Sequence, residues 1–317
     1  MTDAPRAWPE FARRRMLLAA GPAALVGVAL AWLLARPEGP EPSSVVRVLA
    51  LGLGSTVLGA GVMWAIGRED RRRADTADTV RPVAAIAGGW AIAEAVHLAL
   101  AAGEATGGGG TTLADFRYFV TDVATGRVGA ATLALVVAAT AVLVAAYRTG
   151  WDRAYVPVVV LAAVALVARP AAGHMAQQPF GSVLDSIHVL AAAVWIGVLG
   201  ALALTVRGRS GWALWLPRYS TLAWRCVLAL TVTGVVDAAV ALGDPLALVS
   251  TGYGRIVVAK AVVLVGLLAL ARRWRRTWVP DAERHRVTAE GSLRRAVAEV
   301  IVMAVAFGLA AALATTA

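Results

Sequence analysis

Long apolar runs follow one another from one end of this sequence to the other. Runs of about 18 or more apolar residues are typical of helices that cross a lipid bilayer. Nine such runs fall at about 16–35, 45–67, 82–102, 127–147, 153–169, 182–206, 219–242, 253–271 and 293–314. Ala, Leu and Gly dominate them, and they lack the alternating pattern of a membrane β-barrel. The sequence therefore predicts an all-α fold, a polytopic transmembrane helical bundle of about nine spans.

Charge is scarce, and its distribution excludes several functions. Only 16% of the residues are charged, against about 25% in a typical soluble domain. The net charge of +10 would suggest nucleic acid in a soluble protein, but here the charges lie in short loops between apolar runs. Gly107–Gly110 precedes Thr111-Thr112 without the Lys of a phosphate-binding loop. We therefore expect no nucleic acid partner, no nucleotide and no enzymatic activity.

The basic residues predict the direction of the spans. With a cytoplasmic amino terminus, 22 of the 30 basic residues fall in inside segments and 6 in outside segments. This asymmetry is the one expected from the positive-inside rule, and it predicts an N-in, C-out topology. Arg13–Arg15 precede the first run without an obvious cleavage site, which indicates an uncleaved signal-anchor helix. Because 29 of the basic residues are Arg and the spans are rich in Ala, we expect the cytoplasmic (inner) membrane of a bacterium with a high-GC genome.

Two segments outside the predicted spans are candidates for contact with the membrane surface. The stretch around Leu113–Val123, in the longest outside loop, is a candidate interfacial helix. The Arg272–Arg276 cluster, with Trp274 and Trp278, is typical of an anchor on anionic lipid headgroups.

Ionisable residues inside membrane spans are costly, and they indicate functional sites. Glu94 and His97 share one face of the third span, and Asp185 and His188 have the same spacing in the sixth. His174 precedes that span in an outside loop. The topology places all five near the outer surface, so the sequence predicts a metal site formed by His97, His188, Glu94, Asp185 and His174.

The donor types limit which metal this site would hold. Imidazole with carboxylate suits Cu(II), Zn or Ni, whereas Cu(I) favours thiolate and thioether. Met175 is the only methionine on the outer side and Cys226 is the only cysteine, so a methionine-lined conduit is not supported. Deeper candidates for a pathway, with Met175 at its entrance, are Asp237, Lys260 and Trp195. Asp237 and Lys260 have an alternative interpretation as an intramembrane ion pair, and Asp185 as a helix cap.

Residues 181–279 contain a series of short motifs in a fixed order: Asp185-x-x-His188-x-x-Ala191-Ala192-x-x-Trp195-x-Gly197-x-x-Gly200, Arg218-Tyr219-Ser220, Thr233-Gly234, Thr251-Gly252-Tyr253-Gly254-Arg255 and Lys260. In this order and spacing they resemble the copper-resistance D (CopD) membrane family. The resemblance divides the chain into an amino-terminal membrane half, 1–180, and a CopD-like half, 181–317. Asp237 departs from the Asn or other polar residue that we expect in relatives.

The resemblance implies a function in copper handling. It implies an inner-membrane protein that binds copper at its outer face and moves it toward the cytoplasm, often with a separate periplasmic copper-binding donor protein. Asp185 and His188 match the motif, whereas His97, Glu94 and His174 follow from topology alone. Two alternatives stay open: a b-type haem electron-transfer protein with His97 and His188 as axial ligands, and a metal-free membrane scaffold.

Overall fold

The computed structural model describes residues 17–36, 41–67, 76–107, 112–172, 180–242 and 246–313, and these form helices and no strand. The all-α prediction is confirmed. In chain order the helices are α2 (Ala20–Leu34), α3 (Ser44–Ile66), α4 (Thr76–Ala105), α5 (Leu113–Asp122), α6 (Ala124–Thr149), α7 (Tyr155–Ala171), α8 (Gly181–Thr205), α9 (Gly208–Leu242), α10 (Ala247–Ser250), α11 (Gly252–Glu283) and α12 (Ala289–Leu313).

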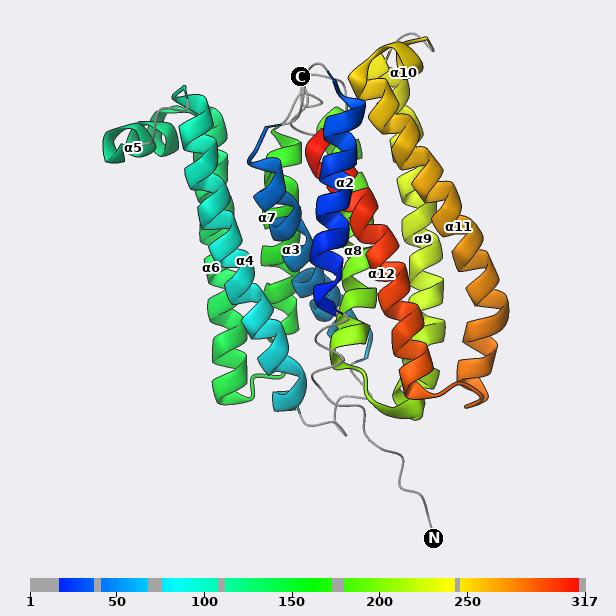
Figure 1. Ribbon diagram of the computed structural model, residues 1–317. Helices are drawn as coiled ribbons and strands as arrows, with labels where there is room; N and C mark the ends of the chain where they lie inside the picture. Colours follow the sequence, from blue (N-terminus) through cyan, green and yellow to red (C-terminus); the bar gives the residue numbers. More distant parts are fainter. Residues whose placement is uncertain are drawn as a thin grey trace.

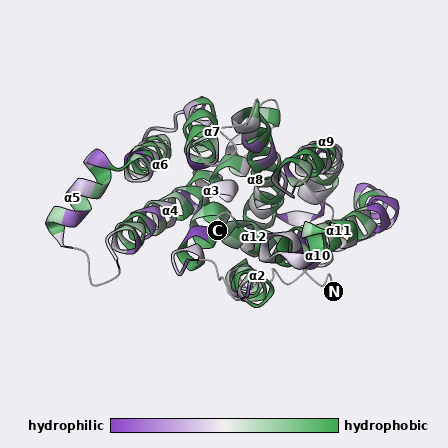
Figure 2. Ribbon diagram, turned by 90° about the horizontal axis from the view of Figure 1, so that it is seen from above, coloured by the Kyte–Doolittle hydropathy of each residue, from purple (hydrophilic) through white to green (hydrophobic). Residues whose placement is uncertain are grey.

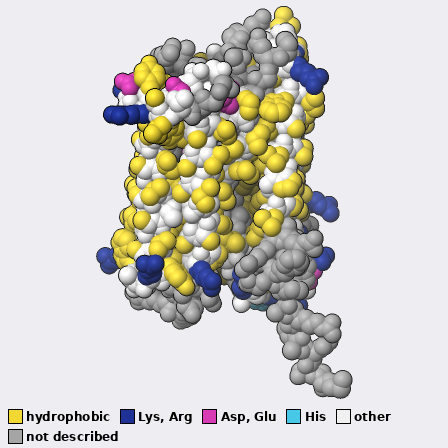
Figure 3. Space-filling view, turned by 60° about the vertical axis from the view of Figure 1, so that its left-hand side comes forward, with side chains coloured by type: hydrophobic (Ala, Val, Ile, Leu, Met, Phe, Trp, Pro, Cys, Tyr) yellow, Lys and Arg dark blue, Asp and Glu magenta, His cyan; other side chains and the backbone are white. Residues whose placement is uncertain are grey.

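Each predicted apolar run coincides with one of these helices. Seven of them, α3, α4, α6, α8, α9, α11 and α12, are long and apolar enough to cross a membrane. The helices α2 and α7, with 15 and 17 residues, are apolar but shorter. Apolar side chains cover the middle of the face shown in Figure 3, and basic side chains lie toward its two ends. The chain is a multi-pass membrane protein, whereas the count of nine spans stays a prediction.

The long helices lie side by side in one bundle (Figure 1). Seen along the bundle, α3, α8 and α12 lie between the pair α4 and α6 on one side and the pair α9 and α11 on the other (Figure 2). The helices α5 and α10 lie at the same end of the bundle, which we call the α5 end; the other is the opposite end. Helices from both predicted halves, including α3 and α8, share one apolar core.

Glycine pairs set the closest helix crossings. A Cβ added to Gly59 on α3 would lie 1.9 Å from the carbonyl carbon of Gly197 on α8, and one added to Gly197 would lie 1.8 Å from Ser55 O. Gly27 on α2 and Gly308 on α12 form a second crossing of this kind. Small residues allow helix backbones to approach closely in membrane proteins. Gly197 of the CopD-like motif is therefore a packing residue.

Two helices extend well beyond their apolar runs. α9 begins at Gly208, ahead of the predicted start at 219, and α11 ends at Glu283, beyond the predicted end at 271. The helices continue past the predicted spans because backbone hydrogen bonding continues past the point where hydropathy falls. The extensions contain Trp212 and Trp278, whose rings lie 6.1 Å apart and are fully buried. Trp278 donates a hydrogen bond to Ser292 Oγ at 3.1 Å, so its predicted role as a headgroup anchor was wrong.

The predicted interfacial segment forms the helix α5, to one side of the bundle (Figure 1). Thr112 and Asp115 form a capping box at its amino terminus. The hydrogen bonds from Thr112 lower the pKa of the exposed Asp115 carboxyl. The buried ring of Phe119 packs against Leu98 and Ala102 of α4 and fastens α5 to the bundle.

Candidate functional site

Glu94 and His97 lie toward the α5 end of α4, and both are buried, with exposed fractions of 4% and 6%. The Glu94 carboxylate forms an ion pair with Arg169 of α7, with Oε2 and Nη1 2.7 Å apart. The Nδ1 atom of His97 has no hydrogen-bond partner among the described residues. The charges that act on this imidazole are the guanidinium groups of Arg169 and Arg47. The charges that act on His97 are therefore positive, which disfavours a metal cation there.

Arg47, on α3, connects this group with a second one. It interacts electrostatically with Glu94 on one side and with Asp185 of α8 on the other. It also interacts with Glu41, just before α3, where burial and the neighbouring Glu104 carboxylate raise the pKa of the Glu41 carboxyl. The α5 end of α3 thus lies in a mixed network of acidic and basic groups.

The imidazole of His188, on α8, is oriented by α9. Its Nδ1 atom lies 2.8 Å from the hydroxyl oxygen of Thr233. That hydroxyl donates its own proton to the carbonyl oxygen of Ala229 at 2.8 Å, so it accepts a hydrogen bond from Nδ1–H. With its proton on Nδ1, the neutral imidazole has its lone pair on Nε2. In this tautomer Nε2 is the nitrogen that can bind a metal. A single side-chain contact therefore prepares His188 as a ligand.

Gly234 provides room for this ring. A Cβ at Gly234 would lie 3.3 Å from Cε1 of His188 and 3.8 Å from its Nδ1. The pair Thr233-Gly234 therefore supplies both the acceptor and the space that the imidazole occupies.

Lys260 of α11 connects His188 with two carboxylates. Lys260 of α11 interacts electrostatically with Asp185, with Asp237 of α9 and with His188. Among the described residues, no ion pair within 4.0 Å joins Lys260 to either carboxylate, so the direct ion pair considered from the sequence is not formed. One carboxylate oxygen of Asp237 is buried and has no hydrogen-bond partner among the described residues, so it remains available to a ligand.

The predicted site residues belong to two groups, one around Glu94 and His97 and one around His188. Within the described ranges, no three His, Cys, Asp or Glu side chains lie close enough together to hold one metal ion. His174 and Met175 lie outside the described residues. Trp195 is buried on α8, on the same face as His188 but two turns further from the α5 end.

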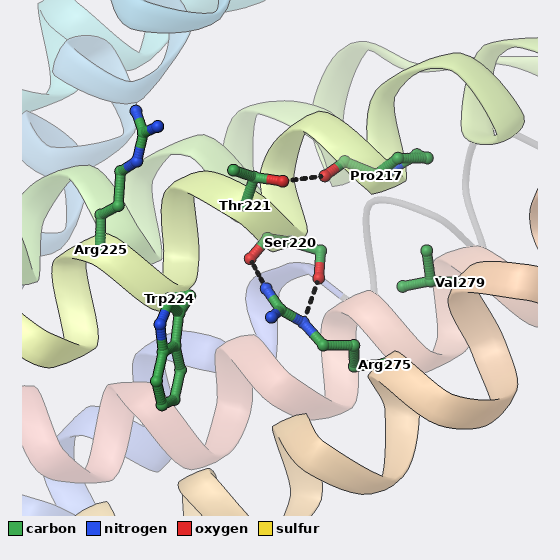
Figure 4. A pocket seen from close by; sticks show the side chains of 7 residues that line it. All are labelled: Pro217, Ser220, Thr221, Trp224, Arg225, Arg275 and Val279. Carbon is green, nitrogen blue, oxygen red and sulfur yellow. Dashed lines mark hydrogen bonds between the residues drawn. The ribbon is translucent and has the colours of Figure 1, made fainter.

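A groove at the opposite end of the bundle contains none of the predicted site residues. It lies between α9 and α11 and is lined by Pro217, Ser220, Thr221, Trp224, Arg225, Arg275 and Val279 (Figure 4). Arg275 reaches across it and donates to the hydroxyl and the carbonyl oxygen of Ser220. This arginine of the predicted lipid anchor fastens α11 to α9.

A comparison with known protein families supports the resemblance to the CopD family. Residues 213–313, from α9 to α12, match the family model of copper resistance protein D. This part of the chain is similar to the CopD family. The match includes most of the CopD motif residues, but it begins after Asp185 and His188. No curated protein and no solved structure shows significant similarity to the chain.

Several CopD motif residues hold the bundle together near the site. The hydroxyl of Thr251 caps α11 by accepting from the backbone N–H of Gly254 at 2.9 Å. Arg255 donates to the carbonyl oxygens of Leu34 and Arg36, at 2.7 and 2.9 Å. These bonds fasten the start of α11 to the end of α2 and position Lys260 two turns further on.

The sequence analysis missed one buried polar pair. Glu299 of α12 is 4% exposed and accepts a hydrogen bond from the hydroxyl of Tyr219 at 3.1 Å. The available signal was a single carboxylate two turns inside the last apolar run. The candidate histidine ligands give no pointer to it, because the sequence predicts them at the outer face, whereas Glu299 lies in the opposite half of the bundle.

Proposed function

We propose that this protein handles copper in a bacterial inner membrane. His188, with Asp185 beside it, binds copper at the α5 end, and the ion then moves across the bundle toward the cytoplasm. The observation on which the proposal depends is the His188–Thr233 hydrogen bond, because it leaves Nε2 with a free lone pair. The CopD match and the multi-pass helical fold support the same function.

The contacts and charges around the two histidines favour His188 over His97. Two guanidinium groups act on His97, whereas one ammonium group, that of Lys260, acts on His188, and this lysine also interacts with Asp185 and Asp237. The carboxylate of Glu94 is already paired with Arg169. We therefore assign the entry site to His188 and Asp185, and a structural role to Glu94. An imidazole and a carboxylate are the donors that Cu(II) prefers.

The proposal includes a topology. Nine helices would cross the membrane with the amino terminus inside and the α5 end outside, as the arginine distribution favours. Copper then reaches His188 from the periplasm, where a separate copper-binding protein is its donor. The bilayer and copper are the only other partners proposed, with no nucleotide, no nucleic acid and no catalysed reaction.

Metal content tests this proposal directly. Full-length protein purified in detergent is expected to bind copper in a fixed ratio, measured by elemental analysis, and His188→Ala is expected to lose it. His285→Asn is the control, because His285 is exposed at the opposite end and Asn tolerates its left-handed backbone. Unchanged copper in His188→Ala would contradict the assignment. A Soret band in the wild type would instead support haem. If the wild type shows neither copper nor a Soret band, the result supports a metal-free scaffold.

A further inference from the structure

A buried carboxyl group lies in the half of the bundle opposite to His188. Glu299 is on the third turn of α12, which begins at the opposite end, and it accepts its hydrogen bond from Tyr219 of α9. Tyr219 is itself buried, and the indole of Trp195, on α8, lies beside it. Three packed helices therefore enclose this carboxyl group.

Among the described residues, no cation on the helices that pack against α12 forms an ion pair with Glu299. From α9 the neighbouring titratable groups are the Tyr219 hydroxyl and the Cys226 thiol. The two arginines of this part of α9 lie elsewhere, since Arg218 stacks over the ring of Trp215 and Arg225 is exposed in the groove between α9 and α11. Within their described lengths, α2 has no charged residue, and the only one on α3, Arg47, lies at the α5 end. On α8 the charged or titratable residues, Asp185 and His188, also lie at the α5 end.

The nearby arginines form no ion pair with Glu299 in the described part of the chain. The four arginines of α11 at this end are exposed: Arg272, Arg273, Arg275 and Arg276. Arg295 precedes Glu299 by one turn on α12, and its Nη1 atom is buried without a hydrogen-bond partner in the described ranges, but Arg295 does not act on Glu299. Among the described residues, Tyr219 is the only side chain that acts on Glu299 electrostatically or by hydrogen bonding.

A single neutral donor does not compensate a buried carboxylate. An ionised carboxyl group has several lone-pair sites to satisfy, and it is stable in an apolar interior only when it is paired with a cation or surrounded by donors. A protonated carboxyl group needs far less compensation. We infer that Glu299 is a proton-binding site, protonated in this conformation, and that its proton exchanges with the aqueous phase at the opposite end during copper movement.

The helices α8 and α9 contribute residues both to the His188 site and to the surroundings of Glu299. Protonation of Glu299 can therefore affect copper binding through the packing of these two helices. Tyr219, Cys226, Thr233 and Asp237 are spaced by seven, seven and four residues, so they share one face of α9. This face spans about 27 Å along the helix axis. His188 and Trp195 share the facing side of α8, seven residues apart. A shift between α8 and α9 would therefore alter both the His188–Thr233 bond and the surroundings of Glu299.

Infrared difference spectroscopy tests the proton site without copper. Full-length wild type at neutral pH should show the C=O stretching band of a protonated carboxyl group that Glu299→Gln lacks. Glu290→Gln is the matched control, because Glu290 lies on the same helix in a surface ion pair with Arg294, and it should retain the band. Tyr219→Phe should shift the band by removing its hydrogen bond. A wild-type spectrum identical to that of Glu299→Gln would overturn the proposal.

The link to copper rests on the proposed function and has its own test. In proteoliposomes with a pH dye inside, copper addition should move protons in the wild type and in Glu290→Gln but not in Glu299→Gln, whose copper content should be unchanged. Proton movement that persists in Glu299→Gln would contradict the coupling. A wild type that binds no copper would contradict the proposed function instead, and the infrared result would still decide whether Glu299 binds a proton.

Discussion

The Nδ1 atom of His188 on α8 and the hydroxyl of Thr233 on α9 lie 2.8 Å apart, although 45 residues separate them in the chain. Because the hydroxyl donates to Ala229 O, the bond selects one imidazole tautomer and fixes the ring plane. Partners of this kind raise the basicity of a metal-binding histidine. The pair therefore links the packing of two helices to the strength of one ligand atom.

Thr233→Val should weaken copper binding while preserving the fold. Valine has nearly the same shape as threonine but offers no acceptor, so His188 loses the bond that orients it. Loss of such a partner typically costs about 10- to 100-fold in metal affinity. Competition titration with a copper chelator measures this change. Thr233→Ser retains the hydroxyl and serves as the control, and equal affinities in the two variants would argue against the orienting role.

Gly234→Ala should disturb the same imidazole by contact. The new Cβ would lie 3.3 Å from Cε1 of His188, which is tight enough that the ring must move. We expect lower copper affinity with little change in thermal stability. Gly266→Ala, on α11, is the control because no atom lies within 4 Å of its added Cβ. Copper affinity that is the same in both variants would show that the space at Gly234 is not needed.

The sequence predicts the fold well because hydropathy records which segments lie in lipid, helix by helix. It predicts the partners of the site residues poorly, because those depend on which helix faces which. Glu94 was assigned to His97 from one-turn spacing, yet its partner is Arg169, 75 residues away on α7. The Arg169 side chain turns into the bundle, where a guanidinium is a stronger partner for the carboxylate than an imidazole is.

Gly197→Ala should destabilise the bundle without acting on copper directly. Its Cβ would overlap the backbone of Ser55, so α3 and α8 would have to separate. Overpacking of this kind costs roughly 1–3 kcal/mol. Thermal unfolding in detergent should show a lower Tm. Gly200→Ala, one turn further along α8, meets only Thr56 at 3.4 Å and should keep the wild-type Tm; a fall as large as that of Gly197→Ala would argue against this crossing.

The amino terminus of α5 should loosen in acid. The folded pKa of Asp115 is lowered by its hydrogen bonds with Thr112, so its contribution is present above the unfolded pKa and is lost as the pH falls through the folded value. Hydrogen exchange of the first-turn amides of α5 should therefore show less protection at acidic pH, after correction for the intrinsic exchange rate. Asp115→Asn should show that lower protection already at neutral pH, and a pH-independent protection in the wild type would contradict the cap.

Variants of the Glu94–Arg169 pair test whether Glu94 stabilises the bundle or binds copper. Glu94→Ala leaves a partly buried guanidinium uncompensated, and breaking a buried pair from one side costs roughly 3–5 kcal/mol. We therefore expect a marked fall in Tm. Removing both charges in Glu94→Gln/Arg169→Met should recover much of that loss, because no unpaired charge remains. The copper content of both variants should equal that of the wild type, measured at a temperature at which all are folded. Copper lost from the stable double variant would restore Glu94 or its surroundings to the metal site, since instability would no longer explain the loss.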